Sequence, residues 1–168
     1  MKIRFIINPI SGTGKQKDIE KYISKHLKNY EIIHTQKTGD ATRISKEAAN
    51  ENIDAVIAVG GDGTINECLK GLVNTNTALG VIPCGSGNGF ANHIGMDRSI
   101  EKAVKQLKDT RVEIIDSCTV NGSPFVNISG IGFDAHIANL FSTLTERGFV
   151  KYAKLVLREL SYNAKEYT

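Results

Sequence analysis

Three glycine-rich segments carry residues that could bind phosphate, at 8–15, 60–67 and 83–89. Glycines let the backbone approach a ligand closely, and free N–H groups at the start of a helix attract an anion. The central segment reads Gly-Gly-Asp-Gly-Thr-Ile-Asn-Glu and places one carboxylate, Asp62, among its glycines. A carboxylate beside a phosphate site suits a metal ion or a hydroxyl group to be deprotonated. Phosphoryl chemistry is therefore the first hypothesis. The alternative is a tight turn in which Asp62 only caps the following helix.

The apolar pattern places each of these segments at the end of a strand. Residues 54–59 form a short β-branched run typical of a buried strand, and apolar residues at helical spacing follow from Ile65 to Val73. The other two segments follow the apolar runs 2–7 and 78–82. Ligands of open α/β sheets bind at the carboxyl ends of the strands. We therefore expect the three segments to meet at one edge of a sheet.

Strands and helices alternate as far as about residue 108. A further strand is expected at 30–35, and helices are expected from about residue 17, from residue 40 and from residue 100. This alternation is typical of βαβ units and a mainly parallel sheet. We predict an α/β fold in which residues 1–110 form a doubly wound, mainly parallel sheet.

The pattern changes in residues 111–168. Two extended runs, 111–120 and 123–129, flank Asn-Gly, the strongest short signal of a β-hairpin. Helical patterns follow at 135–144 and 149–160. We expect these residues to begin a β-rich second domain that is cut short, because a hairpin and two helices are a poor basis for an independent core.

Composition favours a soluble globular protein, since 40% of the residues are hydrophobic and 23% are charged. No apolar run approaches the ~20 residues of a membrane span, and the first residues do not resemble a signal peptide. The 3 cysteines lack paired spacing, which argues against a disulfide framework or a zinc site. The 4 histidines show no metal-ligand spacing either. We expect a cytoplasmic protein with reduced thiols.

The net charge of +3 is unevenly distributed. Up to residue 28 the basic residues are Lys2, Arg4, Lys15, Lys17, Lys21, Lys25 and Lys28. Such a basic face could meet an anionic ligand or lipid headgroups. The alternative is an ordinary solvated helix face.

The central segment resembles the signature of the diacylglycerol kinase catalytic domain family, the lipid kinases that include sphingosine and ceramide kinases. Three further stretches fit that family, at 8–15, 83–88 and 127–135. The resemblance runs from residue 3 to about residue 160, with four motifs in the family's order. A shorter Gly-Gly-Asp-Gly also occurs in NAD kinases and phosphofructokinases, which are similar in fold.

The resemblance implies an ATP-dependent kinase that transfers the γ-phosphoryl of ATP to a lipid hydroxyl, with Mg²⁺ as a second cofactor. It implies that residues 1–110 are the nucleotide-binding domain and that residues 111–168 begin the substrate domain. It implies that Asp62 is catalytic and holds the metal or positions the acceptor hydroxyl. The implied nucleotide-binding residues are Asn8, Ser11, Gly12, Thr35, Gly61, Asp62, Gly63, Thr64, Ile65, Asn66, Glu67 and Ser86. Glu67 could bind ribose or metal, or only favour the helix dipole. Asp116 and Asp134 are further acidic candidates, expected to face a cleft between domains.

Two departures from the family pattern affect these expectations. Residues 88–92 read Asn-Gly-Phe-Ala-Asn where members close to bacterial diacylglycerol kinase carry Asn-Asp-Phe-Ala-Arg. The Gly-Ser-Gly-Asn form is more similar to the sphingosine and ceramide branch, which leaves the acceptor open between diacylglycerol-like and sphingoid-like lipids. Bacterial members are also longer and place a proposed general base and a structural Mg²⁺ site beyond residue 168. This chain alone is expected to bind nucleotide and to lack part of the catalytic machinery.

The expected partner is a lipid substrate at a membrane surface, reached by transient peripheral contact, with no nucleic acid; a homodimer stays open. Two rival functions remain. An NAD kinase or another soluble small-molecule kinase would turn over without lipid and has no use for a basic face. A nucleotide-binding fragment without catalysis would bind ATP and transfer nothing.

Overall fold

The computed structural model describes residues 1–11, 15–143 and 149–162 of the chain. These residues form two compact units, 1–127 and 128–168, and each is described by itself. The elements of the first unit are β1 (Ile3–Ile7), a 3₁₀ turn (Lys15–Asp18), α1 (Ile19–His26), β2 (Tyr30–His34), α2 (Asp40–Asn50), β3 (Ala55–Gly60), α3 (Asp62–Leu72), β4 (Ala78–Pro83), α4 (Gly89–His93), α5 (Ile100–Gln106), β5 (Cys118–Val120) and β6 (Ser123–Phe125).

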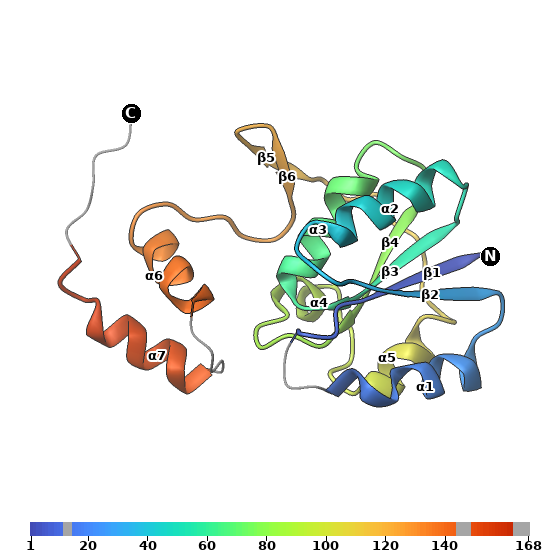
Figure 1. Cartoon of the computed structure of the whole chain (residues 1–168), viewed down its shortest axis with the longest axis horizontal. Helices are drawn as coiled ribbons and strands as arrows, with labels where there is room; N and C mark the ends of the chain where they lie inside the picture. Colours follow the sequence, from blue (N-terminus) through green and yellow to red (C-terminus); the bar gives the residue numbers. More distant parts are fainter. Residues whose placement is uncertain (12–14, 144–148, 163–168) are drawn as a thin grey trace. The chain divides into compact units, whose positions relative to one another are not determined.

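A four-stranded parallel sheet in the order β2-β1-β3-β4 forms the centre of the first unit. Helices α2 and α3 cover one face of this sheet, and α1 and α5 cover the other (Figure 1). The predicted doubly wound α/β fold is therefore confirmed. Strands β1, β3 and β4 are neighbours, and in their pairing Ile7 lies opposite Val59, and Val59 lies opposite Ile82. The carboxyl ends of β1, β3 and β4 are consequently level with one another.

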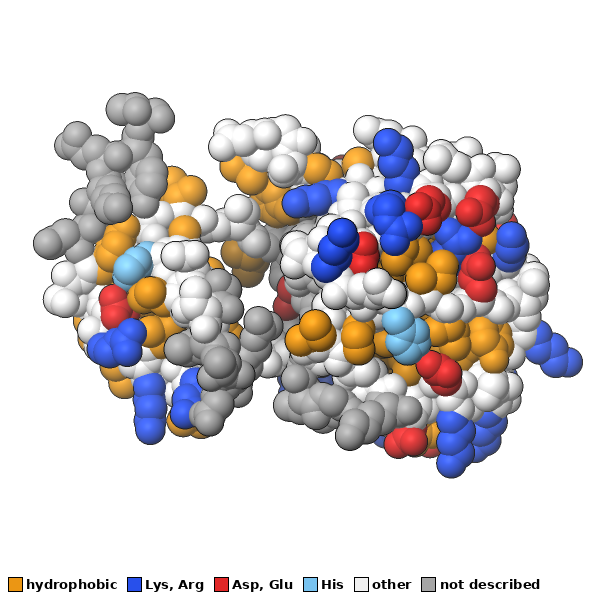
Figure 2. Space-filling model, in the orientation of Figure 1, with side chains coloured by type: hydrophobic (Ala, Val, Ile, Leu, Met, Phe, Trp, Pro, Cys, Tyr) orange, Lys and Arg blue, Asp and Glu red, His pale blue; other side chains and the backbone are white. Residues whose placement is uncertain are grey.

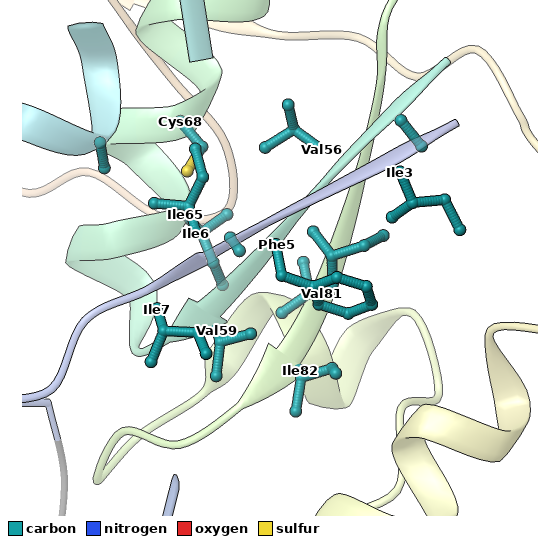
Figure 3. Packing of buried hydrophobic residues seen from close by; sticks show 14 of the residues in the cluster. Ile3, Phe5, Ile6, Ile7, Val56, Val59, Ile65, Cys68, Val81 and Ile82 are labelled. Atoms are coloured by element: carbon teal, nitrogen blue, oxygen red, sulfur yellow. The ribbon is translucent and has the colours of Figure 1, made fainter. Parts of the chain in front are cut away.

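The two inner strands are buried along their whole length, which explains their nearly unbroken apolar sequences. Alternate side chains of β1 point to opposite faces of the sheet. Ile6 lies with Ile65 and Cys68 of α3, whereas Phe5 is on the other face (Figure 3). Burial of a large aliphatic or aromatic side chain stabilises a fold by about 1.5–3 kcal/mol. These strands therefore hold the carboxyl edge of the sheet rigidly.

Arg4 is the exception among the side chains of β1. It is only 3% exposed, and its guanidinium pairs with Glu31 at 2.7 Å and with Glu51 at 2.6 Å. It also donates to the carbonyl oxygen of Ile44 in α2. Arg4 thus joins β1, β2 and α2, and the prediction that it belongs to an exposed basic face is wrong.

The rest of the predicted basic face is exposed where the structure describes it. The side chains of Lys2, Lys21, Lys25 and Lys28 are in contact with solvent, and those of Lys15 and Lys17 lie outside the described part. On the face drawn in Figure 2, basic and acidic side chains are interspersed over α2, where Arg43 pairs with Glu47 at 2.8 Å. The described side chains of α2 therefore carry both positive and negative charge on this face.

The hairpin is present but shorter than predicted. Its strands are confined to residues 118–120 and 123–125, whereas residues 111–117 lie outside any strand. The turn has Asn121 at φ 49° and Gly122 at φ 75°, as the Asn-Gly signal predicts. The longer strands were wrong because a strand needs a hydrogen-bonded neighbour, and none of the described residues pairs with 111–117. Ile114 is accordingly fully exposed.

The second unit contains α6 (Phe133–Ser142) and α7 (Phe149–Arg158), close to the two predicted helices. Phe141 and Tyr152 meet edge to face with ring centroids 5.4 Å apart, and His136 lies 2.9 Å from Glu159. The predicted β-rich domain and the boundary at residue 110 remain predictions. Of the described helices, none has the length and the hydropathy that crossing a bilayer requires.

Candidate functional site

Three loops meet at the carboxyl edge of the sheet, because β1, β3 and β4 are parallel neighbours. Asn8 donates its side-chain Nδ2 to Oγ1 of Thr64 at 3.1 Å, which joins the first loop to the second. The second and third loops approach so closely that a Cβ on Gly85 would lie 2.5 Å from Cα of Gly61. Only glycine fits at such an approach. The glycines of the two segments are therefore needed for the loops to meet.

The first loop is held by a residue that the sequence analysis did not single out. Gln16, which is 8% exposed, donates its Nε2 to the carbonyl oxygens of Asn8, Pro9 and Ser11 at 3.0, 3.0 and 2.8 Å. Ser11 also donates to the carbonyl oxygen of Asn8, both from its backbone and from its hydroxyl. Gly12, predicted to bind nucleotide, lies outside the described residues.

The second loop leads directly into α3 with Gly61 as its N-cap residue. Within the described part of the chain, no side chain caps the first turn of this helix. Gly63 is exposed, and a Cβ added there would meet nothing within 4 Å. The start of α3 thus has an open approach and the partial positive charge of a helix N-terminus.

Asp62 is turned toward the third loop. Its Oδ2 accepts the backbone N–H of Gly89, and its Oδ1 accepts that of Phe90, both at 3.1 Å. These two N–H groups belong to the first turn of α4. The alternative that Asp62 caps the helix that follows it is therefore wrong, since it caps α4 instead.

The other polar side chains at the start of α3 also bind different segments of the chain. Thr64 accepts from Asn8, Asn66 Oδ1 accepts the backbone N–H of Val126 at 3.1 Å, and Glu67 Oε2 accepts that of Gly39 at 3.0 Å. The first two turns of α3 therefore connect the loops after β1, β2 and β4 and the end of the hairpin. Ile65 is buried in the core.

The loop after β2 brings Thr35 to the same edge of the sheet. The backbone N–H of Thr35 donates to the carbonyl oxygen of Ile7, and its side chain is 9% exposed. Asp40 fixes this loop by accepting the backbone N–H groups of Gln36 and Lys37 at 2.8 and 3.1 Å. These hydrogen bonds hold the pKa of Asp40 below its ordinary value. Sequence reasoning missed this role, although Asp at the start of a helix was a usable signal.

The third loop is shaped by Asn88, which has a left-handed backbone with φ 55°. Its side chain accepts the N–H of Gly85 and donates to the carbonyl oxygen of the same residue, both at 2.7 Å. Ser86 is exposed at the tip between them. A hydroxyl on a loop fixed in this way is available to a ligand.

The predicted site residues within the described part therefore lie either on the loops after β1, β2 and β4 or in the first two turns of α3 with its N-cap Gly61, and Ile65 alone among these described residues belongs to the core. The described residues hold no group of three or more His, Cys, Asp or Glu side chains that could form a metal cage. Asp62 is the carboxylate placed between the second and third loops. Whether Asp116 and Asp134 face a common cleft remains a prediction, since they belong to different units.

A groove of about 490 Å³ also lies in the first unit, away from these loops. It runs along β4 and is lined by apolar side chains that include Ile57, Val81, Ile94 and Leu107. None of the residues predicted to bind nucleotide lines it. The groove is therefore separate from the candidate phosphate site.

Comparison with known proteins gives a consistent family assignment. The model of the diacylglycerol kinase catalytic domain matches residues 2–120. The chain is 40% identical over 141 residues to the diacylglycerol kinase of Bacillus subtilis (strain 168), which covers 78% of this chain and 46% of that protein. It is 33% identical over 137 residues to the diacylglycerol kinase of Staphylococcus aureus (strain JH9), which covers 78% of this chain and 44% of that protein.

A solved structure shares the fold. The crystal structure of a diacylglycerol kinase from Bacillus anthracis superposes with a TM-score of 0.71 at 33% identity, covering 83% of this chain and 50% of that chain. The chain thus spans about half the length of the relatives that it matches.

Proposed function

Because the chain belongs to the diacylglycerol kinase catalytic domain family, we propose that it is the nucleotide-binding part of an ATP-dependent lipid kinase. The observation that carries the proposal is the meeting of three glycine-rich loops around the open N-terminus of α3. Kinase catalysis depends on positioning and on electrostatic stabilisation of the phosphoryl group. The proposed acceptor is a hydroxyl of a diacylglycerol- or sphingoid-like lipid.

The residues present fit a bound nucleotide. Gly61 and Gly85 carry no side chain, so the second and third loops meet through backbone atoms. Backbone N–H groups and the hydroxyls of Ser11, Thr35 and Ser86 would hold phosphate and ribose oxygens. Asn8 would complete the lining together with Gly61 to Thr64 and Glu67 at the start of α3.

One carboxylate is also enough for the magnesium ion of such a site. Mg²⁺ in kinases usually keeps several waters and binds through one or two carboxylates together with substrate phosphates. Asp62 uses one lone pair on each oxygen for Gly89 and Phe90, which leaves acceptor positions on both. Bound there, the ion would neutralise charge on the phosphates. Asp62 would hold it or orient the acceptor hydroxyl.

The proposed partner is a lipid at a membrane surface, met by transient peripheral contact from the cytoplasm. The exposed lysines at 2, 21, 25 and 28 support this, because basic side chains near a membrane attract anionic lipids. Within the described residues, no helix offers a membrane span as an alternative way of reaching lipid.

The test is calorimetric titration of the chain with Mg-ATP, with Asp62→Asn in parallel. Asp109→Asn is the matched control, because Asp109 is exposed and lines the groove along β4, away from the glycine-rich loops. We expect the chain and the control to bind and Asp62→Asn to bind at least about tenfold more weakly, as loss of one charged contact implies. Absence of binding by the unaltered chain would overturn the proposal.

The same samples then enter a radiolabelled-ATP transfer assay with diacylglycerol, sphingosine and NAD. Transfer to one lipid identifies the acceptor, and transfer to NAD without lipid replaces the lipid kinase with a soluble kinase. Binding without transfer favours a nucleotide-binding fragment, which is the second candidate because the chain spans about half of its relatives.

A further inference from the structure

Asn66 holds a segment that lies sixty positions further along the chain. Its side-chain Oδ1 accepts the backbone N–H of Val126 at 3.1 Å. The Val126 side chain is only 6% exposed, and the strand just before it, β6, packs against α3. The end of the hairpin is thereby fixed on the first turns of α3, beside the loops that meet there.

Asn127 extends this contact to α4. Its backbone has φ 81°, a conformation that L residues rarely adopt. Its side chain lies against Gly89, where an added Cβ would be 2.5 Å from Asn127 Nδ2 and 3.8 Å from Asp62 Oδ1. Residues 126 and 127 therefore touch the starts of both α3 and α4, and the compact first unit ends at Asn127.

We infer that Asn66 is a positioning residue. Its side chain fixes residues 126–127, where the chain leaves the first unit, against the starts of α3 and α4. In this role the Asn66 side chain holds Val126, and the nucleotide is bound by the neighbouring backbone and side chains. The reason is that Oδ1 of Asn66 already accepts a hydrogen bond from the backbone of Val126, a buried residue, and breaking it would leave the Val126 N–H unpaired. The nucleotide part of this inference rests on the proposed function.

The position of residues 126–127 is then coupled to the geometry of the phosphate loops. A displacement of the first turns of α3 would move the acceptor of the Val126 N–H. The position at which the chain leaves the first unit therefore depends on the conformation of residues 60–67.

The first arm of the test measures amide hydrogen exchange by NMR in the full chain and in three variants. Asn66→Ala removes the acceptor, Asn66→Gln displaces it by one methylene, and Asn66→Asp keeps an acceptor oxygen in place. We expect the Val126 amide to exchange about tenfold faster in Asn66→Ala and Asn66→Gln, as loss of one hydrogen bond implies, and near the original rate in Asn66→Asp.

Asn50→Ala is the control, because Asn50 is exposed at the end of α2. Amides of β3 serve as an internal reference for global unfolding and are expected to keep their rates. Unchanged exchange at Val126 in both Asn66→Ala and Asn66→Gln would overturn the inference.

The second arm measures Mg-ATP affinity of the same variants by calorimetry. A positioning residue predicts a loss of less than about threefold for Asn66→Ala. A loss of tenfold or more with unchanged exchange at Val126 would make Asn66 a nucleotide contact and overturn the inference. If the unaltered chain binds no Mg-ATP, the proposed function fails, and the exchange arm alone decides the role of Asn66.

Discussion

At the scale of single residues, Asp62 combines a structural and a proposed chemical role. Its two oxygens accept the N–H groups of Gly89 and Phe90, so its charge stabilises the start of α4. Asn in its place would keep one acceptor oxygen and would turn an amide group toward the other N–H. The hydrogen bonds to α4 do not need magnesium, whereas the proposed chemical role does. Measurements with and without Mg²⁺ can therefore separate the two roles.

We predict that Asp62→Ala and Asp62→Asn lower the free energy of unfolding by about 1–3 kcal/mol, with Ala the larger loss. Urea denaturation followed by circular dichroism measures this. Calorimetry with ATP in the presence and absence of Mg²⁺ should show a larger loss of affinity when the metal is present. An equal loss in both conditions would contradict a metal-binding role.

The cysteines provide a second prediction at this scale. Burial raises the pKa of the Cys68 thiol to about 12, whereas Cys118 is exposed on the hairpin. The thiolate is the reactive form, so Cys68 should react with a thiol reagent such as dithionitrobenzoate only after unfolding. Cys118 should react within minutes at pH 8, and Cys118→Ser should abolish this rapid phase. A rapid phase that persists in Cys118→Ser would contradict the prediction.

The residue types of the site could be predicted from the sequence, but their partners could not. Glycines and Asp62 were recognisable because their chemistry is local to one segment. The partners Gly89, Val126 and Gly39 come from other segments and depend on which loops the sheet brings together. Gln16 escaped notice because a glutamine in a loop has no distinctive pattern.

At the scale of elements, the loop before α2 depends on the charge of one carboxylate. The N–H groups of Gln36 and Lys37 lower the pKa of Asp40 below its ordinary value of 3.8. A lowered pKa means that the native state favours the ionised form, so the stabilisation is complete above the ordinary pKa. It is lost as the pH falls through the lower, native pKa.

We therefore predict that Asp40→Asn is less stable than the unaltered chain at pH 7 and that this difference shrinks below about pH 4. Thermal melts from pH 2.5 to pH 7 measure the difference. Asp109→Asn, which removes the charge of an exposed carboxylate in the same unit, is the control for the loss of one negative charge. A difference that is independent of pH would refute the role of the charge.

The crossing of α2 and α3 gives a second prediction at this scale. A Cβ on Gly71 would lie 2.5 Å from the carbonyl oxygen of Thr42 and 2.8 Å from the backbone nitrogen of Lys46. Gly71→Ala should therefore force the helices apart and cost about 1–3 kcal/mol, although alanine favours a helix in general. Urea denaturation tests this, with the exposed Lys70→Ala as control. A stabilised Gly71→Ala would contradict the close crossing.

The elements themselves were mostly predictable because their periodicity is strong. Strands β1 and β3 are buried on both faces, so they read as short unbroken apolar runs, whereas helices α2, α3 and α5 bury one face each, so their apolar residues recur at helical spacing. The error at 111–117 arose because an alternating apolar run indicates a strand only where a neighbour pairs with it. Helix α4 has 5 residues, too few for a periodic pattern, and it was not predicted.

At the scale of the whole molecule, the two units differ in how much core they possess. Most of the buried hydrophobic residues belong to the first unit, whereas Ile137 and Leu155 are those of the second among the described residues. Stability requires enough buried apolar surface to offset conformational entropy. We predict that amides in α6 and α7 exchange at least about a hundredfold faster than those of β1 and β3. Exchange measured by mass spectrometry tests this, and equal protection would refute it.

The bonding of α3 to other segments determines what it would take to transplant this site into another scaffold. Copying residues 60–67 alone would carry over the recognisable motif and leave its side chains without their counterparts. Asn8, Gly39, Gly89 and Val126 would have to be copied with it, in a framework that presents them from four separate places. The unit that could be transferred is a set of contacts scattered over more than a hundred positions of the chain. A match to the short motif alone, in an unrelated chain, is therefore weak grounds for inferring the same site.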